Sequence, residues 1–94
     1  MDEHTAFHIA SLFSALSDPT RVRIIDLLLD SELSVGAIAE QLGMGESAVS
    51  HQLRGLRDRR IIRTRKQGRN VYVCLDDEHV VTLFQRGLDH VLHG

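Results

Sequence analysis

Four side chains near the C-terminal end have types and spacings suited to metal binding, namely Asp77, His79, His90 and His93. Imidazole nitrogens and carboxylate oxygens are, with thiolates, the donors that Zn(II) takes in proteins. On a helical wheel the three histidines fall within one arc of about 80°. If residues 77–93 form a helix, the histidines therefore share one of its faces. A solvated polar face that carries histidines by chance is the alternative interpretation.

The length of that helix prevents one chain from completing such a site. At about 1.5 Å per residue, the segment from His79 to His90 spans roughly 16 Å, whereas a zinc–nitrogen bond is only about 2 Å long. Two antiparallel copies would bring Asp77 and His79 of one chain beside the other chain's last helical turn. A two-fold homodimer would thus hold two equivalent inter-subunit sites. We expect Asp77 at the helix boundary, where aspartate is a favoured cap.

Hydrophobic side chains recur on a second face of the same segment. Val80, Phe84, Leu88 and Val91 fall within another arc of about 80°, which predicts a stripe that faces the core.

The totals describe one small globular domain over residues 1–94. Hydrophobic residues make up 43% and charged residues 26% of the chain, which is typical of a folded protein. No apolar run is long enough to cross a membrane, and the N-terminus lacks a signal-peptide pattern. The single cysteine, Cys74, cannot form an internal disulfide. We therefore expect a cytoplasmic protein with no membrane partner.

The net charge of −2 conceals a strong asymmetry along the chain. Residues 46–70 carry eight basic and two acidic side chains, a charge of +6, and the remainder carries −8. A concentrated basic segment on an acidic body is typical of a nucleic-acid-binding face, whereas an ordinary solvated helix mixes the two signs. This segment therefore argues for DNA binding and against a module that only dimerises.

Two short helices surround a glycine-containing turn in this part of the chain. The apolar spacing predicts helices over 34–42 and from Glu46 to residue 57, separated by Gly43-Met44-Gly45. Such a pair is a helix-turn-helix pattern. The outer face of the second helix offers side chains suited to base edges and phosphates, namely Ser47, Ser50, His51, Gln52 and Arg54.

Two further helices precede this pair, and a hairpin follows it. Residues 5–16 read as a first helix, and Asp18-Pro19 begins a second that ends near Asp30. Strand-forming residues on both sides of Gly68-Arg69 predict a β-hairpin with a basic tip, in which Cys74 is buried. Its candidate DNA contacts are Arg63, Arg65, Lys66 and Arg69. The fold class is thus mainly α (α+β), a winged helix-turn-helix of order α-α-α-α-β-β-α that forms a homodimer through its terminal helices.

Four motifs carry a family resemblance over essentially the whole chain. They are Leu-Ser-Asp-Pro-Thr-Arg at 16–21, Glu-Ser-Ala-Val-Ser-His-Gln-Leu at 46–53 followed by Leu56, Arg-Lys-Gln-Gly-Arg at 65–69, and Asp-x-His at 77–79 with His-x-x-His at 90–93. Together they resemble the ArsR/SmtB winged-helix metal-sensing repressors. The resemblance implies an apo dimer that binds double-stranded operator DNA at an inverted repeat. Metal binding would release the DNA and derepress genes for metal efflux or sequestration.

The resemblance also discriminates among metal sites. Family members that bind soft metals use a Glu-Leu-Cys-Val-Cys-like segment, and here Glu32–Gly36 contains no cysteine. The site that remains matches at Asp77, His79, His90 and His93, which implies Zn(II) at two inter-subunit sites per dimer. The alternatives are Ni(II) or Co(II), with His4 and His8 as candidate extra ligands, or a proton as the signal.

An enzyme, specifically a metal-dependent hydrolase, is an alternative interpretation of the candidate metal ligands. The chain has no His-Glu-x-x-His motif and no carboxylate placed as a general base beside the candidate ligands. We therefore expect no enzymatic activity.

Overall fold

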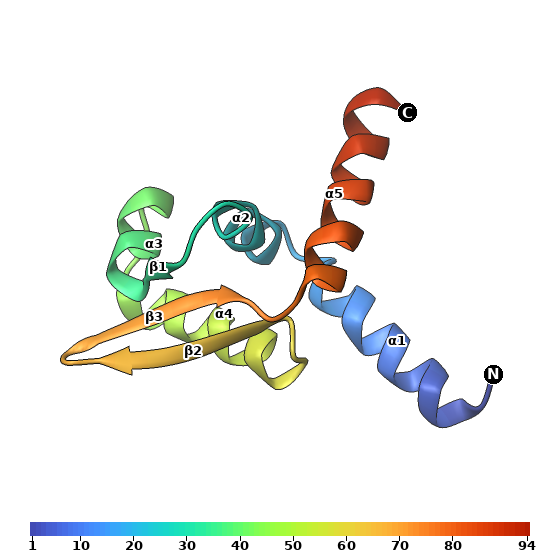
Figure 1. Ribbon diagram of the computed structural model, residues 1–94, viewed down its shortest axis with the longest axis horizontal. Coiled ribbons are helices and arrows are strands. Elements are labelled where there is room, and N and C mark those ends of the chain that lie inside the picture. The colour runs from blue at the N-terminus through green and yellow to red at the C-terminus, as the bar shows by residue number, and fades with distance from the viewer.

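The computed structural model describes all residues, 1–94, as five helices and a three-stranded sheet (Figure 1). The helices are α1 (Glu3–Ala15), α2 (Pro19–Leu27), α3 (Val35–Leu42), α4 (Glu46–Asp58) and α5 (Glu78–His93). The strands are β1 (Leu33–Ser34), β2 (Ile62–Gln67) and β3 (Asn70–Leu75). The predicted winged helix-turn-helix order is confirmed, with β1 as one addition. The prediction for the second helix was too long, because α2 ends at Leu27.

Side chains at the N-terminal boundaries explain where four of the five helices begin. A helix leaves its first backbone N–H groups without partners, and an Asp or Ser side chain just before it can accept from one of them. The caps and their donors are Asp2 with Thr5 N, Asp18 with Arg21 N, Ser34 with Ala37 N, and Asp77 with Val80 N, at 2.7 to 3.0 Å. Asp77 thus lies at the boundary where the sequence places it.

The turn between α3 and α4 depends on a left-handed residue. Gly43 has φ 65°, a conformation that only glycine adopts at little cost. In this position the N–H groups of Gly43 and Met44 donate to the carbonyls of Glu40 and Ala39, at 3.2 and 3.0 Å. These bonds end α3 and direct the chain into α4.

The sheet has strand order β1-β3-β2 and is antiparallel throughout. Gln67 pairs with Asn70, so the hairpin turn has two residues, with Gly68 at φ 62° in its first position. The sheet presents one face to the core and the other outward, since side chains alternate along each strand. Cys74 lies on the outer face, opposite Arg63, and is half-buried, so the prediction that it is buried was wrong.

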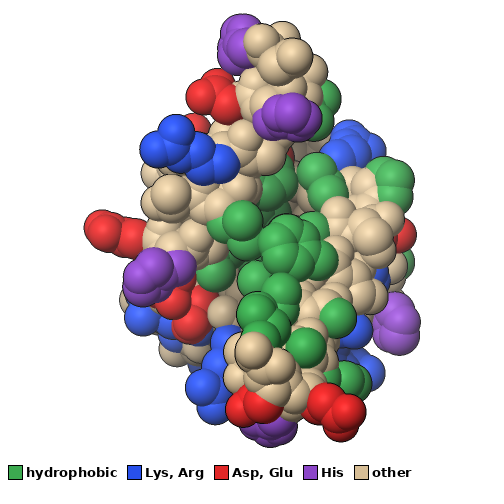
Figure 2. Space-filling view, turned by 90° about the vertical axis from the view of Figure 1, so that its right-hand side faces the viewer, with side chains coloured by type: hydrophobic (Ala, Val, Ile, Leu, Met, Phe, Trp, Pro, Cys, Tyr) green, Lys and Arg blue, Asp and Glu red, His purple; other side chains and the backbone are tan.

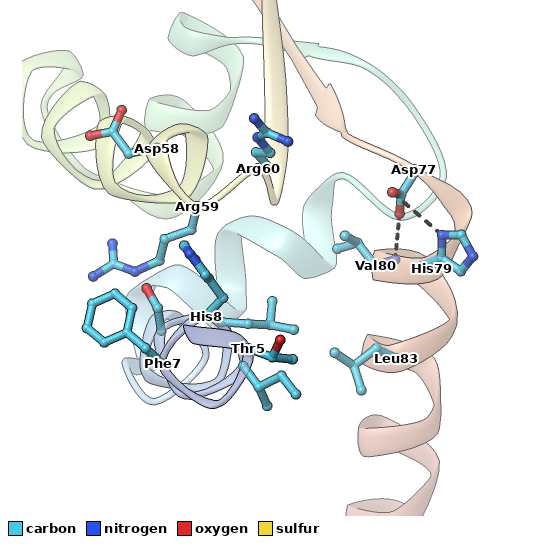
Figure 3. A pocket seen from close by; sticks show the side chains of 13 residues that line it. Thr5, Phe7, His8, Asp58, Arg59, Arg60, Asp77, His79, Val80 and Leu83 are labelled. Carbon is cyan, nitrogen blue, oxygen red and sulfur yellow. Dashed lines mark hydrogen bonds and ion pairs between the residues drawn. The ribbon is translucent and has the colours of Figure 1, made fainter. Parts of the chain in front are cut away.

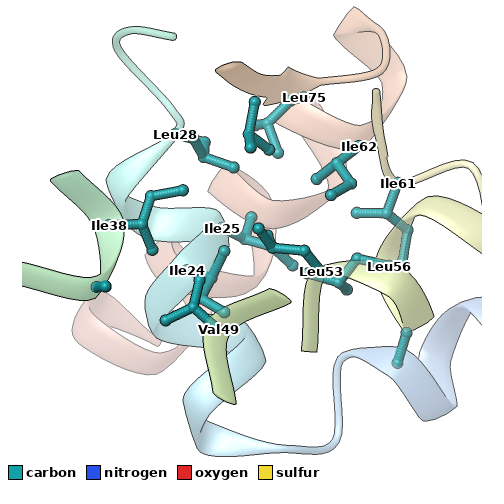
Figure 4. Close-up of a cluster of buried hydrophobic side chains, with 13 residues drawn as sticks. Ile24, Ile25, Leu28, Ile38, Val49, Leu53, Leu56, Ile61, Ile62 and Leu75 are labelled. Atoms are coloured by element: carbon teal, nitrogen blue, oxygen red, sulfur yellow. The ribbon is translucent and has the colours of Figure 1, made fainter. Parts of the chain in front are cut away.

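Thirteen buried hydrophobic side chains form the core beneath α2, α3, α4 and the sheet (Figure 4). Its largest fully buried members are Ile24, Ile25, Ile38, Leu56, Ile61, Ile62, Val49 and Val73. Helix α1 contributes only Ala15 to this group, and α5 contributes no buried residue. Figure 1 shows α1 and α5 on one side of this body, with the β2–β3 hairpin extending from the other. No helix combines the length and hydropathy needed to cross a bilayer.

The apolar stripe of α5 divides into two halves with different environments. Val80 and Phe84 pack against the core, as predicted. Leu88 is 38% exposed and Val91 is 81% exposed, so the prediction that they face the core of their own chain was wrong. Figure 1 shows the C-terminal half of α5 extending beyond the core body, which agrees with the exposure of these two side chains.

Arg21 joins α1 to the rest of the molecule. Its Nε donates to the carbonyl of Ala15 at 2.8 Å, and its Nη2 donates to the carbonyl of Ser14 at 3.2 Å. These carbonyls belong to the last turn of α1, where backbone acceptors lack helical partners and a cation is favoured. The guanidinium therefore holds the α1–α2 corner.

Removal of this guanidinium should destabilise the protein. Hydrogen bonds from a charged group contribute about 1.5–3 kcal/mol, and we expect Arg21→Ala to lower the free energy of unfolding by about 2 kcal/mol. Urea unfolding at one fixed protein concentration measures the change. Arg23→Ala, which removes an exposed arginine of the same helix, is the matched control and should change it by less than about 0.5 kcal/mol. Equal effects of the two substitutions would contradict the role of Arg21 in holding the α1–α2 corner.

A strained residue lies two positions after the end of α4. Arg60 has φ 58° and is the one non-glycine residue with positive φ. Its N–H donates to the carbonyl of Arg57, and the N–H of Ile61 donates to the carbonyl of Leu56, both at 3.0 Å. These bonds require the left-handed conformation that costs a side-chain-bearing residue about 1–2 kcal/mol.

Glycine at this position should stabilise the fold. We expect Arg60→Gly to raise the free energy of unfolding by about 0.5–1 kcal/mol, since relief of strain outweighs the added freedom of the unfolded chain. Thermal unfolding would show the gain as a higher Tm. Arg59→Gly, at an ordinary φ of −94°, should lower Tm instead. A lower Tm for both variants would contradict the conclusion that the backbone of Arg60 is strained.

Candidate nucleic-acid interface and metal centre

The predicted recognition helix turns its polar face outward. Ser47, Ser50, His51 and Arg54 are exposed, and Gln52 is half-buried. The opposite face of α4 is buried in the core through Val49, Leu53 and Leu56. The core thus fixes which side of α4 is free to approach another molecule.

A polar notch of about 470 Å³ lies between α4, the start of α3 and the hairpin tip. The structure brings four of the predicted DNA-binding residues together there: Ser47, Ser50, Arg54 and Arg69. Two arginines with hydroxyl groups around them suit a phosphate oxygen. The lining also includes residues that the sequence analysis missed as candidates: Ser34, Gly36, Glu46 and Asn70. Only the sheet register and the helix packing bring these side chains beside α4, so no local sequence signal identifies them.

The hairpin does not bring its predicted contacts to one surface. Arg63 and Arg65 lie on the outer face of the sheet, and Lys66 lies on the inner face, because the strand alternates between faces. Arg65 is occupied within the chain, where its Nη2 lies 2.6 Å from Glu32 Oε1. Of the four predicted hairpin contacts, Arg69 alone lines the notch.

At the start of α5, two candidate metal donors lie together. Asp77 Oδ2 is 3.6 Å from His79 Nδ1. On a regular helix these positions would diverge, but Asp77 has extended backbone angles, φ −155° and ψ 176°, as the cap. The N–H of Val80 donates to the carboxylate, and this bond, with the nearby His79, lowers the pKa of Asp77. The carboxylate is therefore ionised at neutral pH and suited to a divalent cation.

The other two candidate donors lie at the opposite end of α5. His90 and His93 are exposed in its last turn, i,i+3 apart, so their side chains can converge. The single chain brings no three His, Cys, Asp or Glu side chains together as a metal site. The four donors thus form two pairs at the two ends of one helix. Each pair fits half of a zinc donor set.

A groove of about 1050 Å³ opens beside the Asp77–His79 pair, between α1, the end of α4 and α5 (Figure 3). His8 and Arg60 line it from the other elements. The His8 ring also lies edge-on to that of His4, with ring centroids 4.5 Å apart.

The terminal helices expose a group of large hydrophobic side chains. Figure 2 shows hydrophobic side chains gathered across the middle of this face, with charged groups and histidines around them. The most exposed large ones are Met1, Phe7, Ile9 and Phe13 from the first helix and its start, and Leu88, Val91 and Leu92 from α5. Exposed apolar groups gathered in this way are typical of protein–protein contacts.

Comparison with known proteins agrees with the fold and the motifs. Residues 18–64 match the family described as "Bacterial regulatory protein, arsR family". The chain is 46% identical over 86 residues to a Synechocystis protein named "Transcriptional repressor SmtB homolog", covering 92% of this chain and 65% of that protein. The chain thus spans slightly less than two thirds of that relative's length. It is 38% identical to the "HTH-type transcriptional regulator NmtR" of Mycobacterium tuberculosis, over 99% of this chain and 78% of that protein.

A solved structure from Mycobacterium bovis gives the same result for the fold. It is described as a homodimeric winged helix-turn-helix DNA-binding domain, Mb0332, and it matches with a TM-score of 0.86 at 28% identity, over 100% of this chain and 94% of that one. These relatives are regulators of transcription or possible ones, not enzymes. The chain belongs to the ArsR family of bacterial regulatory proteins.

Proposed function

We propose that the protein is a metal-responsive transcriptional repressor whose homodimer binds operator DNA and is released from it by Zn(II). The carrying observation is the division of four metal donors between the two ends of an exposed helix, α5. Exposed hydrophobic side chains accompany them on α1 and α5, which supports a dimer built through these helices. The names of the relatives, among them a repressor and a homodimeric DNA-binding domain, point the same way.

In this proposal the dimer reads DNA with its two α4 helices. Helix-turn-helix dimers place their recognition helices about 34 Å apart, one turn of DNA, to enter successive major grooves of an inverted repeat. The polar face of α4 reads base edges, and Arg54 and Arg69 contact phosphates beside it.

Zn(II), when bound, would supply a positive charge shared by the donor pair of one chain and the donor pair in the last turn of the partner's α5. The residues that hold it are Asp77 and His79 of one chain with His90 and His93 of the other. Pinning the terminal helices favours a dimer whose α4 helices no longer match the DNA spacing. Because the coupling is reciprocal, operator DNA weakens zinc binding by the same factor.

His90 also offers a route from the metal to the DNA-binding helix. A metal-bound histidine usually donates its second ring N–H to a carbonyl or carboxylate. Arg60, at the end of α4, lines the same groove as Asp77 and His79. Antiparallel α5 helices would place the partner's His90 at this groove, where a backbone carbonyl near Arg60 can accept the N–H.

The direct test measures DNA affinity with and without metal. The DNA is the region upstream of the protein's own gene, at one fixed salt concentration. We expect one Zn(II) per chain to lower the affinity by about 5- to 150-fold, the usual range of coupling between sites. Tight DNA binding that ignores zinc would reject the zinc signal and keep the DNA-binding fold.

Ni(II) or Co(II) is the second candidate signal. It is favoured by one observation, that His8 lines the groove beside the Asp77–His79 pair. If Ni(II) is the signal, it releases DNA where Zn(II) does not, and His8→Ala abolishes that release. A change of DNA affinity with pH but with no metal would point to a proton instead.

A further inference from the structure

We propose that Arg65 is a positioning residue of the wing, the hairpin of β2 and β3, and makes no contact with DNA. Held by Glu32, it ties the two edge strands of the sheet together over the central strand. The tie sets the place of the hairpin tip, so that Arg69 faces Arg54 across the notch. This inference rests on the proposed DNA-binding function and assigns separate tasks to the basic side chains of the wing.

The contacts of Arg65 engage all three nitrogens of its guanidinium group. Its Nε lies 3.1 and 3.0 Å from the two carboxylate oxygens of Glu32, and its Nη2 lies 2.6 Å from Oε1. Its Nη1 donates to Gln67 Oε1 at 2.7 Å. The planar guanidinium and the planar carboxylate form parallel hydrogen bonds in this two-pronged arrangement. The bonds fix the relative orientation of the two groups as well as the distance between them.

The sheet explains how residues 33 positions apart meet. Arg65 on β2 pairs with Tyr72 on β3, and Tyr72 pairs with Ser34 on β1. Because Arg65 and Tyr72 lie directly opposite each other, their side chains share the outer face. Arg65 crosses β3 over the Tyr72 ring, 4.7 Å from its centroid, and reaches Glu32, which immediately precedes β1. The clamp, defined as Glu32, Arg65, Gln67 and Tyr72, thus spans the whole width of the sheet.

The outer face also points away from the recognition helix. Ile62 and Val73 lie on the inner face and are buried, and α4 packs against β2. Arg65 is three residues along from Ile62, so it lies on the other face. The notch is lined by Arg54 and Arg69 but not by Arg65. A phosphate in the notch would therefore meet the guanidinium groups of Arg54 and Arg69, beside the Glu46 carboxylate, but not that of Arg65.

The charge of Arg65 is already balanced. The hydrogen bond from Arg65 lowers the pKa of Glu32, so the carboxylate stays ionised throughout the neutral range. A phosphate that took the same two-pronged position on Arg65 would have to displace this carboxylate. Arg69 has no such partner among the ion pairs of the chain.

The dependence of DNA affinity on salt separates the two tasks. Each phosphate contact contributes about −0.9 to the slope of log affinity against log salt, so loss of one contact per chain changes the slope of a dimer by about 1.8. We expect Arg69→Ala to flatten the slope by that amount. Arg65→Ala should lower the affinity about tenfold at fixed salt, and because it acts by displacing Arg69, it should flatten the slope by no more than Arg69→Ala does. In a protein that already carries Arg69→Ala, adding Arg65→Ala should flatten the slope no further; a further flattening would mean that Arg65 itself contacts a phosphate and would overturn the proposal.

Two further variants keep the test independent of folding defects. Glu32→Gln retains the shape of the side chain and should lower affinity without making the slope steeper; a steeper slope would mean that freed Arg65 binds phosphate, and would overturn the proposal. The exchange of charges, Glu32→Arg with Arg65→Glu, should restore affinity to within about threefold of the unaltered protein. Failure of this exchange to restore it, in a variant that keeps its circular dichroism spectrum, would also overturn the positioning role.

Amide hydrogen exchange without DNA tests the clamp by itself. Loss of Arg65 should speed exchange of the β1 and β2 amides that pair with β3, while the exchange of charges should restore their protection. Unchanged exchange in Arg65→Ala would overturn the clamp. If the clamp is present but the unaltered protein shows no salt-dependent binding to DNA, the proposed function fails, and with it the wing's task, which distinguishes that failure from failure of the clamp.

Discussion

His90→Ala should leave DNA binding intact and abolish its response to zinc. The substitution removes one of the donors at the far end of α5 but touches neither the core nor α4. We expect the loss of affinity caused by one Zn(II) per chain, about 5- to 150-fold in the unaltered protein, to shrink to less than about twofold. Fluorescence anisotropy of a labelled operator duplex at fixed salt measures both states of each protein.

The matched control removes histidines that lie outside the four donors. His4 and His8 are exposed on α1, and the double variant His4→Ala with His8→Ala should keep the full zinc response. If the double variant loses the response as His90→Ala does, the site includes α1, and the choice of nickel or cobalt gains support. An unaltered zinc response in His90→Ala would contradict the α5 site.

Leu88→Glu should dissociate the dimer and lower DNA affinity more than 100-fold. Leu88 is 38% exposed in the chain and lies among the hydrophobic side chains of the terminal helices. A two-fold contact would bury the new carboxylate twice, and an unpaired buried charge costs about 3–5 kcal/mol. Each 1.4 kcal/mol is a tenfold change in an equilibrium constant. Sedimentation velocity would show a monomer at concentrations at which the unaltered protein is a dimer.

A second charge substitution controls for the added carboxylate. Gln41→Glu introduces the same group on an exposed position of α3, away from the terminal helices. The Gln41→Glu protein should sediment as a dimer, with the same sedimentation coefficient as the unaltered protein. A Leu88→Glu protein that stays dimeric and binds DNA would place the interface on another surface.

Most of the fold follows from local rules that the sequence displays. Asp18-Pro19 begins a helix because the side chain caps it and proline fits its first turn. Gly43 and Gly68 adopt positive φ where the turns require it. In contrast, β1 has only two residues, and its pairing with β3 defines it, so no periodicity within the strand itself identifies it.

The parts of the site that the sequence did not predict depend on contacts across the fold. The basic residues of the hairpin look equivalent in sequence, but pairing with Glu32 distinguishes Arg65 from Arg69. The α5 stripe was misassigned for a related reason. A hydrophobic stripe has the same spacing whether it packs on its own core or on another chain, so Leu88 and Val91 could not be distinguished from Phe84.

The placement of α5 outside the core has a consequence for how such a sensor can change in evolution. Most substitutions destabilise a protein, and those in a core do so most severely. Only Val80, Val81 and Phe84 of α5 pack against the core, and no residue of α5 is fully buried, so new ligand residues can arise at its exposed positions without unfolding the body that carries α4. A gene duplicate could therefore explore different donor sets while retaining its fold. In the proposed metal sensor, selectivity for the ion and the ability to fold are thus largely separate targets of selection.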